Sequence, residues 1–159
     1  MNNNNPQSGS GLTKSSLPRG LRNCNPLNIR ITPKQRSGQD RWKGMTPQQT
    51  DPAFCQFESM EWGWRAAFHL LTRNYYHQHQ LHTIRTIIGR WAPPKDRNNT
   101  EAYVGRVAQL MRYNPDFELG IPSMHPARWM MLGVAMAVVE NGTDCLDYMA
   151  MLQGWQLLK

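Results

Sequence analysis

A strongly apolar run near the end of the chain, closed by a single carboxylate, places the tightest constraint on how this chain can fold. Residues 127–140 contain few polar side chains, Pro126 precedes them and Asn141-Gly142 follows them. Proline is favoured in the first turn of a helix, and glycine is favoured just after the last turn. The run therefore predicts an apolar helix over about 127–140 that ends at Glu140.

Glu140 is the first candidate for a catalytic group. A partly buried helix C-terminus disfavours an anion, because the helix dipole leaves partial negative charge there and burial removes water. Both effects raise the pKa of a carboxyl group, and the general acid of a glycosidase has to be protonated near neutral pH. The local sequence leaves one alternative open, an ordinary exposed glutamate in the last turn of a helix.

Helical patterns also fill most of the chain that precedes this run. Residues 61–81 carry apolar side chains at steps of three and four, which is typical of an amphipathic helix. Capping residues and proline pairs predict where the further helices begin and end. These boundaries are Thr83 and Trp91 for a short helix, Asn99 or Thr100 for the start of the next, and Asp144 for the start of the last.

The N-terminal part has a different composition. Residues 1–17 are mostly Asn, Ser, Gly, Gln and Pro, which predicts a disordered leader. From residue 18 to about 57 the chain is loop-like, with two short alternating apolar pieces that predict a small two- or three-stranded sheet. The expected fold class is α+β, mostly α, with one domain over 18–159 and a small β or loop lobe.

Composition narrows the function classes. The net charge of +7, from 18 Lys+Arg and 11 Asp+Glu, suits any polyanion: nucleic acid, anionic lipid or the bacterial wall. The basic residues are scattered and form no arginine-rich arm, so a nucleic-acid-binding protein is the weakest of the alternatives. No phosphate-binding glycine loop and no nucleophile elbow is present.

Metal and redox patterns are equally sparse. Three cysteines without a CxxC pair exclude a zinc ribbon, and one disulfide with a free thiol stays open. His77, His79 and His82 do not share one helix face, so a solvated histidine face is favoured over a metal site. No cofactor and no metal are expected.

The ends of the chain bear on localisation. The opening MNNNNP has neither a basic start nor an apolar core, so no Sec signal peptide is expected. The longest apolar stretch, 129–139, is shorter than the ~20 residues that span a bilayer. These features predict a soluble monomer, made in the cytoplasm, that reaches the periplasm or cell wall by secretion, lysis or virion delivery.

Two further features resemble parts of a sugar-binding site. Asn23, Asn25 and Asn28 are closely spaced amides around Pro26, and amides read sugar hydroxyls and N-acetyl groups. A polar turn that satisfies only its own backbone is the alternative for this segment. Trp42 lies in the loop-like part and is a candidate platform for stacking a sugar ring.

A second carboxylate is needed if water is the nucleophile. Asp40 and Asp51 both lie in the loop-like lobe that would face Glu140. Asp51 is preferred because the strand-like segment 52–57 follows it. Either carboxylate could hold a water molecule or stabilise an oxocarbenium-like centre.

The order of motifs resembles a bacterial and phage family that is often labelled a virion structural protein. Its RGxRNNNPGNIR opening is matched by residues 19–30, and its AMxxxENG segment by residues 135–142. Further matches lie between these two segments, at 42–44, 51–57, 61–67, 87–94 and 99–104. The sequence departs from the family at Cys24, where Asn is usual, at Leu27, where Gly is usual, and in a longer 95–100 stretch.

This family looks like lysozyme-type murein hydrolases, which implies a fold, a substrate and a reaction. The resemblance implies a circularly permuted lysozyme-like domain in which Glu140 lies next to the Asn-rich segment. The implied reaction is cleavage of the peptidoglycan glycan strand by a muramidase or a lytic transglycosylase. Glu140 and Asp51 would then be catalytic, and the candidate glycan contacts would be Asn23, Asn25, Asn28, Arg30, Trp42 and Tyr103.

Partners and alternatives follow from this interpretation. The expected partner is the peptidoglycan strand, with an immunity or inhibitor protein added if the chain is an antibacterial effector, and no nucleic acid. A non-catalytic virion or wall-binding protein with the same fold is the main alternative. Whether cleavage is hydrolysis or transglycosylation depends on the second carboxylate, which the sequence leaves open.

Overall fold

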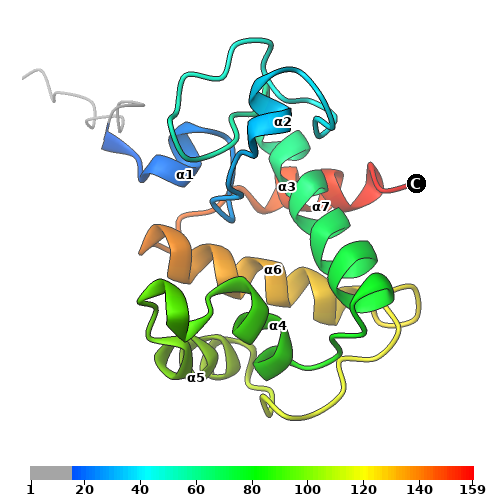
Figure 1. Cartoon of the computed structure of the whole chain (residues 1–159). Helices are drawn as coiled ribbons and strands as arrows, with labels where there is room; N and C mark the ends of the chain where they lie inside the picture. Colours follow the sequence, from blue (N-terminus) through cyan, green and yellow to red (C-terminus); the bar gives the residue numbers. More distant parts are fainter. Residues whose placement is uncertain (1–15) are drawn as a thin grey trace, which may run out of the picture.

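The computed structural model describes residues 16–159, so most of the predicted leader, residues 1–17, lies outside the described residues. The described part is mostly helical, as predicted (Figure 1). Its elements in chain order are α1 (Arg19–Arg22), α2 (Pro33–Arg36), α3 (Met60–His69), the π-helical η2 (Leu70–Gln78), α4 (Ile84–Trp91), the 3-10 helix η3 (Pro94–Asp96), α5 (Thr100–Met111), α6 (Pro126–Asn141) and α7 (Tyr148–Gln156).

The predicted helix boundaries hold at five places, one of which is the end of α4 at Trp91. Thr83 caps α4 by accepting a hydrogen bond from the Thr86 backbone N–H, and Asn99 caps α5 in the same way. Pro126 opens α6, which ends where Gly142 takes a left-handed conformation with φ 64°.

The start of the last helix was predicted wrongly. Asp144 is not its first residue, since α7 begins at Tyr148. Asp147 provides the cap, and its side chain accepts from the Ala150 backbone N–H at 3.0 Å. An aspartate at either position could cap a helix. The segment before Asp147 instead forms a local turn, in which the Cys145 N–H donates to Thr143 Oγ1.

The small sheet is also not formed among the described residues. Two isolated antiparallel bridges stand in its place, Arg30 with Phe54 and Met45 with Phe57. Polar side chains take over backbone groups that a strand ladder would use. The Asn25 amide donates to the carbonyls of Ile29 and Cys55 and accepts from the Ile29 N–H.

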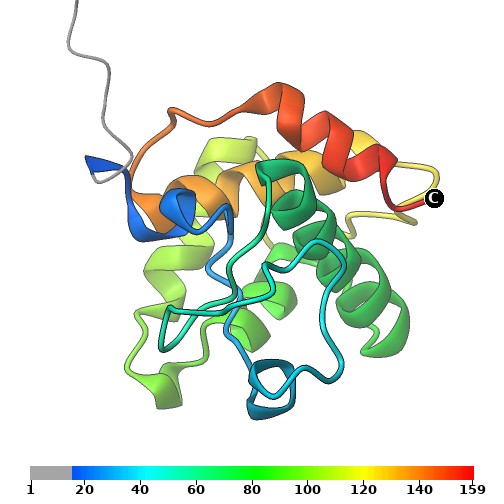
Figure 2. The same ribbon diagram turned by 90° about the horizontal axis from the view of Figure 1, so that it is seen from above.

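Helix α6 runs through the centre of the molecule (Figure 1). The loop-like segment with α1 and α2 lies on one side of it, and α4 and α5 lie on the other. Helix α7 packs along α3, and the view from above shows it at the edge of the molecule (Figure 2). The axis of the fold is therefore the apolar helix that the sequence predicted.

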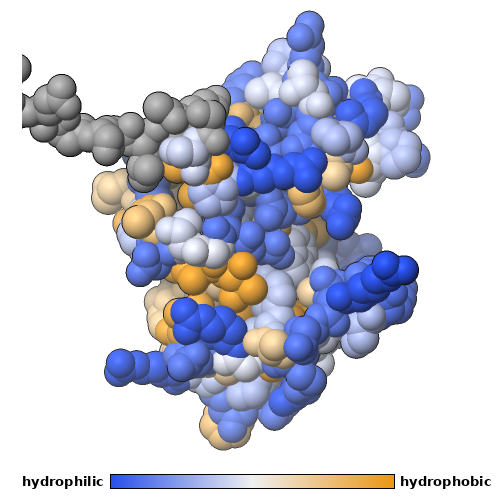
Figure 3. Space-filling model, turned by 90° about the vertical axis from the view of Figure 1, so that its left-hand side faces the viewer, coloured by the Kyte–Doolittle hydropathy of each residue, from blue (hydrophilic) through white to orange (hydrophobic). Residues whose placement is uncertain are grey.

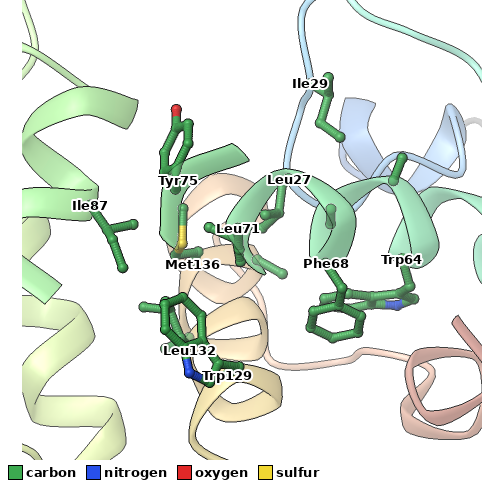
Figure 4. Packing of buried hydrophobic residues seen from close by; sticks show 14 of the residues in the cluster. Leu27, Ile29, Trp64, Phe68, Leu71, Tyr75, Ile87, Trp129, Leu132 and Met136 are labelled. Carbon is green, nitrogen blue, oxygen red and sulfur yellow. The ribbon is translucent and has the colours of Figure 1, made fainter. Parts of the chain in front are cut away.

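The core fills the space between α6 and the long helical rod of α3 and η2. Trp64 and Phe68 stack with ring centroids 5.4 Å apart, and Leu71, Leu132 and Met136 are fully buried beside them (Figure 4). Two glycines permit these close approaches. A Cβ on Gly133 would lie 2.7 Å from the Phe68 ring, and one on Gly154 would lie 2.4 Å from the Trp64 Cβ.

Candidate active site

The carboxylate of Glu140 lies at the C-terminal end of α6, half-buried, and accepts hydrogen bonds from three separate parts of the chain. The Trp91 indole N–H donates to Oε1 at 2.8 Å, and the Tyr103 hydroxyl donates to the same oxygen at 3.2 Å. The Asn28 amide donates to Oε2 at 3.3 Å. The end of α4, helix α5 and the N-terminal segment therefore fix the orientation of one carboxyl group.

Asn141 joins the end of α6 to the N-terminal segment. Its buried amide N–H₂ donates to the Pro26 carbonyl and to the Ala137 carbonyl, both at 2.8 Å. Two residues after Pro26, Asn28 has a left-handed backbone conformation with φ 52°, which asparagine tolerates better than most residues. This conformation turns the Asn28 side chain toward Glu140, 112 residues away in sequence.

Helix α1 packs closely against this junction through Gly20. A Cβ on Gly20 would lie 2.5 Å from Asn141 Oδ1 and 2.7 Å from Asn28 Oδ1. Both of these oxygens are buried and accept no hydrogen bond. The site therefore has two unsatisfied acceptors directly behind the residue that contacts Glu140.

A cleft of about 890 Å³ opens in front of the Glu140 carboxylate, a volume typical of a ligand site. One wall comes from the N-terminal segment and the other from α4, α5 and the loop that follows α4. Figure 3 shows the surface hollowed between the upper and lower parts of the molecule. The polar and aromatic residues that line the cleft are Asn28, Arg30, Phe54, Tyr75, Trp91, Lys95, Asp96, Arg97, Asn98, Tyr103 and Glu140.

The phenols of the cleft stay protonated. Burial raises the pKa of Tyr103 far above its usual value, and the negative charge of the neighbouring Glu140 carboxylate adds a smaller rise. Burial likewise raises the pKa of Tyr75. The Tyr103 hydroxyl therefore keeps its proton and donates a hydrogen bond to Glu140, with the Met136 carbonyl as a longer second acceptor at 3.5 Å.

Four of the residues proposed from the sequence line this cleft: Glu140, Asn28, Arg30 and Tyr103. Asn25 is fully buried and binds only backbone groups, so the polar-turn alternative describes it correctly. Trp42 is not among the lining residues, and its ring packs edge-on against His69 at 5.4 Å.

Asp51 is also absent from the lining residues, and its oxygens are occupied elsewhere. Arg19 donates to both of them, at 2.8 and 2.6 Å, and the Asn23 amide donates at 2.9 Å. The backbone N–H groups of Ala53 and Phe54 complete the set. The Arg19 guanidinium holds the pKa of Asp51 well below its usual range. This geometry makes Asp51 and Asn23 a structural clamp between α1 and the 51–54 turn.

Sequence reasoning did not select Trp91 or the residues of the 95–98 loop as site residues. Trp91 carried one usable signal, since it ends a short helix just before Pro93-Pro94, and a partly buried indole N–H usually finds an acceptor. The loop residues carry no such signal, because their place on the cleft depends on how α4 and α5 pack.

The departures at Cys24 and Leu27 from the motif that the sequence resembles differ in how well they fit the local geometry. Cys24 adopts a left-handed conformation with φ 52°, which an asparagine would adopt with less strain. Leu27 has no positive φ and is fully buried in the core, so the usual glycine is not required there.

The fold and the site define a mostly helical protein with one centrally held carboxylate in a polar, basic cleft. No family model matches the chain. The chain is 33% identical over 141 residues to Protein P5 of Pseudoalteromonas phage PM2, which covers 87% of this chain and 80% of the phage protein. The chain therefore belongs to the same family as this phage protein. Within the described residues, no helix is both long enough and apolar enough to cross a membrane.

Proposed function

We propose that this chain cleaves the glycan strand of peptidoglycan, with Glu140 as the general acid, on a circularly permuted lysozyme-like domain. The observation that carries the proposal is the half-buried Glu140 carboxyl group, oriented by Trp91, Tyr103 and Asn28 at the wall of an open cleft. The contact between Asn28 and Glu140 agrees with a permuted arrangement, in which the Asn-rich segment meets the Glu-tipped helix.

The surroundings of Glu140 provide partners for its protonated form. The Asn28 amide can turn by 180° about its last torsion, which exchanges its oxygen and nitrogen. The oxygen would then face Glu140 Oε2 and accept the carboxylic proton. The nitrogen would take the place of the unsatisfied Asn28 Oδ1, on the side of Gly20 where Asn141 Oδ1 also lacks a donor. Both states of the acid therefore have a hydrogen-bond partner.

The carboxylates in the cleft favour transglycosylation over hydrolysis. Among the lining residues only Glu140 and Asp96 carry a carboxylate, and Asp96 is exposed at the end of η3. In the proposed reaction Glu140 donates its proton to the glycosidic oxygen as the C1–O bond breaks. The C6 hydroxyl of the same MurNAc residue bonds to C1 and returns its proton to Glu140. This route needs neither a bound water nor a second carboxylate.

The charge and the phage relative support a bacterial wall as the site of the proposed activity. A net charge of +7 favours adsorption to an anionic polymer, and the relative comes from a phage. We propose action in the periplasm or cell wall after lysis, virion delivery or secretion, with an immunity or inhibitor protein as partner in the secreted case.

The test is clearance of purified sacculi by the full chain and by Glu140→Gln. General acid catalysis contributes about 10²- to 10⁴-fold, so the variant should lose that much of the initial rate while keeping the wild-type circular dichroism spectrum. Glu58→Gln, which removes an exposed carboxylate outside the cleft, is the matched control and should clear at the wild-type rate. A folded Glu140→Gln protein that clears sacculi at the wild-type rate would disprove the proposal.

A further inference from the structure

Basic side chains reach the cleft from both of its walls. Arg30 comes from the N-terminal segment, and Lys95 and Arg97 come from the loop after α4. All three are exposed, and within residues 16–159 none of them is in a salt bridge. The cleft therefore has three cations without a salt-bridge partner, against two lining carboxylates, Asp96 and Glu140.

The loop that carries Lys95 and Arg97 has a defined shape. Arg97 is held in a left-handed conformation, φ 63° and ψ 24°, which residues with a side chain rarely adopt. The Arg97 N–H donates to the Pro94 carbonyl at 3.0 Å, and the Asn98 amide donates to the Pro93 carbonyl at 3.1 Å. Backbone strain that the surroundings maintain is concentrated at ligand sites. These bonds fix the backbone of the loop, from which Lys95 and Arg97 line the cleft.

Arg30, on the wall opposite the Lys95–Arg97 loop, is positioned by its neighbour Phe54. Its guanidinium lies 5.3 Å from the centre of the Phe54 ring, and the Arg30–Phe54 bridge fixes both residues on the backbone. Guanidinium groups bind carboxylates through paired N–H donors, and a lysine ammonium adds a point charge. The three side chains therefore match carboxylate groups carried by a bound ligand.

The same cleft is a poor match for nucleic acid. A phosphate backbone carries one charge at every nucleotide, and it would have to pass the Glu140 carboxylate between the basic residues. A neutral chain with acidic groups only at intervals avoids this repulsion. Peptidoglycan has this pattern, because its sugars are neutral and its side peptides end in carboxylates.

We propose that Arg30, Lys95 and Arg97 form a carboxylate subsite, which binds the acidic peptide substituents of the glycan strand and so selects peptide-bearing strands over uncharged glycan. This inference rests on the proposed function for its ligand. Binding to sacculi tests it independently of cleavage.

The experiment compares two sacculus preparations, one native and one whose free carboxylates have been converted to neutral amides. Sedimentation of the full-length protein with each preparation gives a Kd. Lys95→Gln/Arg97→Gln removes two charges of the subsite, and Arg22→Gln/Lys43→Gln removes two exposed charges outside the cleft. Each binding measurement is made on the Glu140→Gln background so that no substrate is consumed.

The subsite predicts that Lys95→Gln/Arg97→Gln weakens binding to native sacculi about tenfold, equivalent to ~1.4 kcal/mol. On amidated sacculi the same variant should bind like its parent, and the control variant should lose far less on either preparation. An equal loss for both double variants would show that bulk charge governs binding and would overturn the subsite. The subsite would also be overturned if Lys95→Gln/Arg97→Gln raised the Kd by the same factor on native and on amidated sacculi.

Failure of the proposed function gives a different result. If the wild-type chain cleaves no sacculi but the binding pattern is as predicted, the subsite stands and the catalytic proposal falls. If cleavage depends on Glu140 but the double variants bind alike, the catalytic proposal stands and the subsite falls.

Discussion

At the scale of single residues, the site depends on donors that reach Glu140 from distant parts of the chain. Trp91 makes the shortest of these contacts, at 2.8 Å. Trp91→Phe keeps an aromatic ring and removes the N–H group. A hydrogen bond to a charged group is worth ~1.5–3 kcal/mol, so we expect kcat on peptidoglycan to fall roughly tenfold or more.

The control for that variant is Trp155→Phe, since Trp155 packs on Phe68 and does not line the cleft. It should leave kcat unchanged, although it removes the same atoms. Wild-type turnover by Trp91→Phe would mean that the indole N–H does not help to orient the acid.

Gly20 gives a second residue-scale prediction. A methyl group on Gly20 would collide with Asn141 Oδ1, Asn28 Oδ1 and the Asn25 carbonyl. Overpacking of this kind costs about 1–3 kcal/mol, so Gly20→Ala should lower the free energy of unfolding by that amount and reduce activity as well.

Gly105→Ala is the matched control for Gly20→Ala. Gly105 lies inside α5, and a Cβ there would meet nothing within 4 Å. Alanine is favoured over glycine in helices by up to ~1 kcal/mol, so this variant should be more stable than wild type. Urea denaturation of the three proteins measures both effects, and equal stabilities for the two variants would contradict the close packing of α1.

At the scale of elements, the Arg19–Asp51 clamp ties α1 to the loop-like segment. The pKa of Asp51 is lowered by Arg19, so its ionised form stabilises the fold at pH values above the usual aspartate pKa of ~3.9. That contribution is lost as the pH falls below ~4 toward the folded-state pKa.

Asp51→Asn tests this clamp through the pH dependence of Tm. We expect the variant to melt well below wild type at pH 7 and the two melting curves to converge at the acid end of a series from pH 7 to pH 2. A Tm difference that does not change with pH would show that the ionised state of Asp51 adds nothing.

The helices could be predicted from the sequence because each carries its signal locally. Thr83, Asn99 and Gly142 mark helix ends by side-chain capping or backbone freedom, and the structure confirms all three. Asp144 and Asp147 carry the same signal three residues apart, so the wrong one was chosen. The prediction of a small sheet was wrong because the alternating pattern of residues 27–31 does not reveal that the Asn25 side chain binds the backbone N–H and carbonyl of Ile29.

The catalytic candidate Glu140 was predictable in part because it too carries a local sequence signal. Glu140 stands out because an apolar helix ends at it, and the matched motifs join it to the Asn-rich segment. Of that segment, only Asn28 contacts the carboxylate. Asp51 was the preferred second carboxylate from its sequence position. Its oxygens instead face Arg19, and such a pairing across 32 residues leaves no local pattern.

At the scale of the whole molecule, the cleft exists because the N-terminal segment and the α4–α5 region lie on opposite sides of α6. The N-terminal segment forms one wall, the α4–α5 region forms the other, and the end of α6 places Glu140 between them. Lys95 and Arg97 join the site only through this packing, which explains why their position could not be predicted from the sequence.

The net charge of +7 also acts on the molecule as a whole. Salt at 1 M reduces the screening length to ~3 Å, from ~10 Å at 0.1 M, so binding of the full chain to sacculi should weaken steeply over that range. Sedimentation at increasing sodium chloride concentration measures this. Salt-independent binding would point to contacts with the uncharged glycan alone.

In the proposed reaction Glu140 cleaves glycan strands by transglycosylation. Mass spectrometry of the muropeptides released from purified sacculi is the decisive measurement, with Glu140→Gln as the blank. We expect wild-type protein to release products that end in 1,6-anhydro-MurNAc and the variant to release none. Products with reducing MurNAc ends would contradict transglycosylation, and the same products from Glu140→Gln would contradict the role of Glu140.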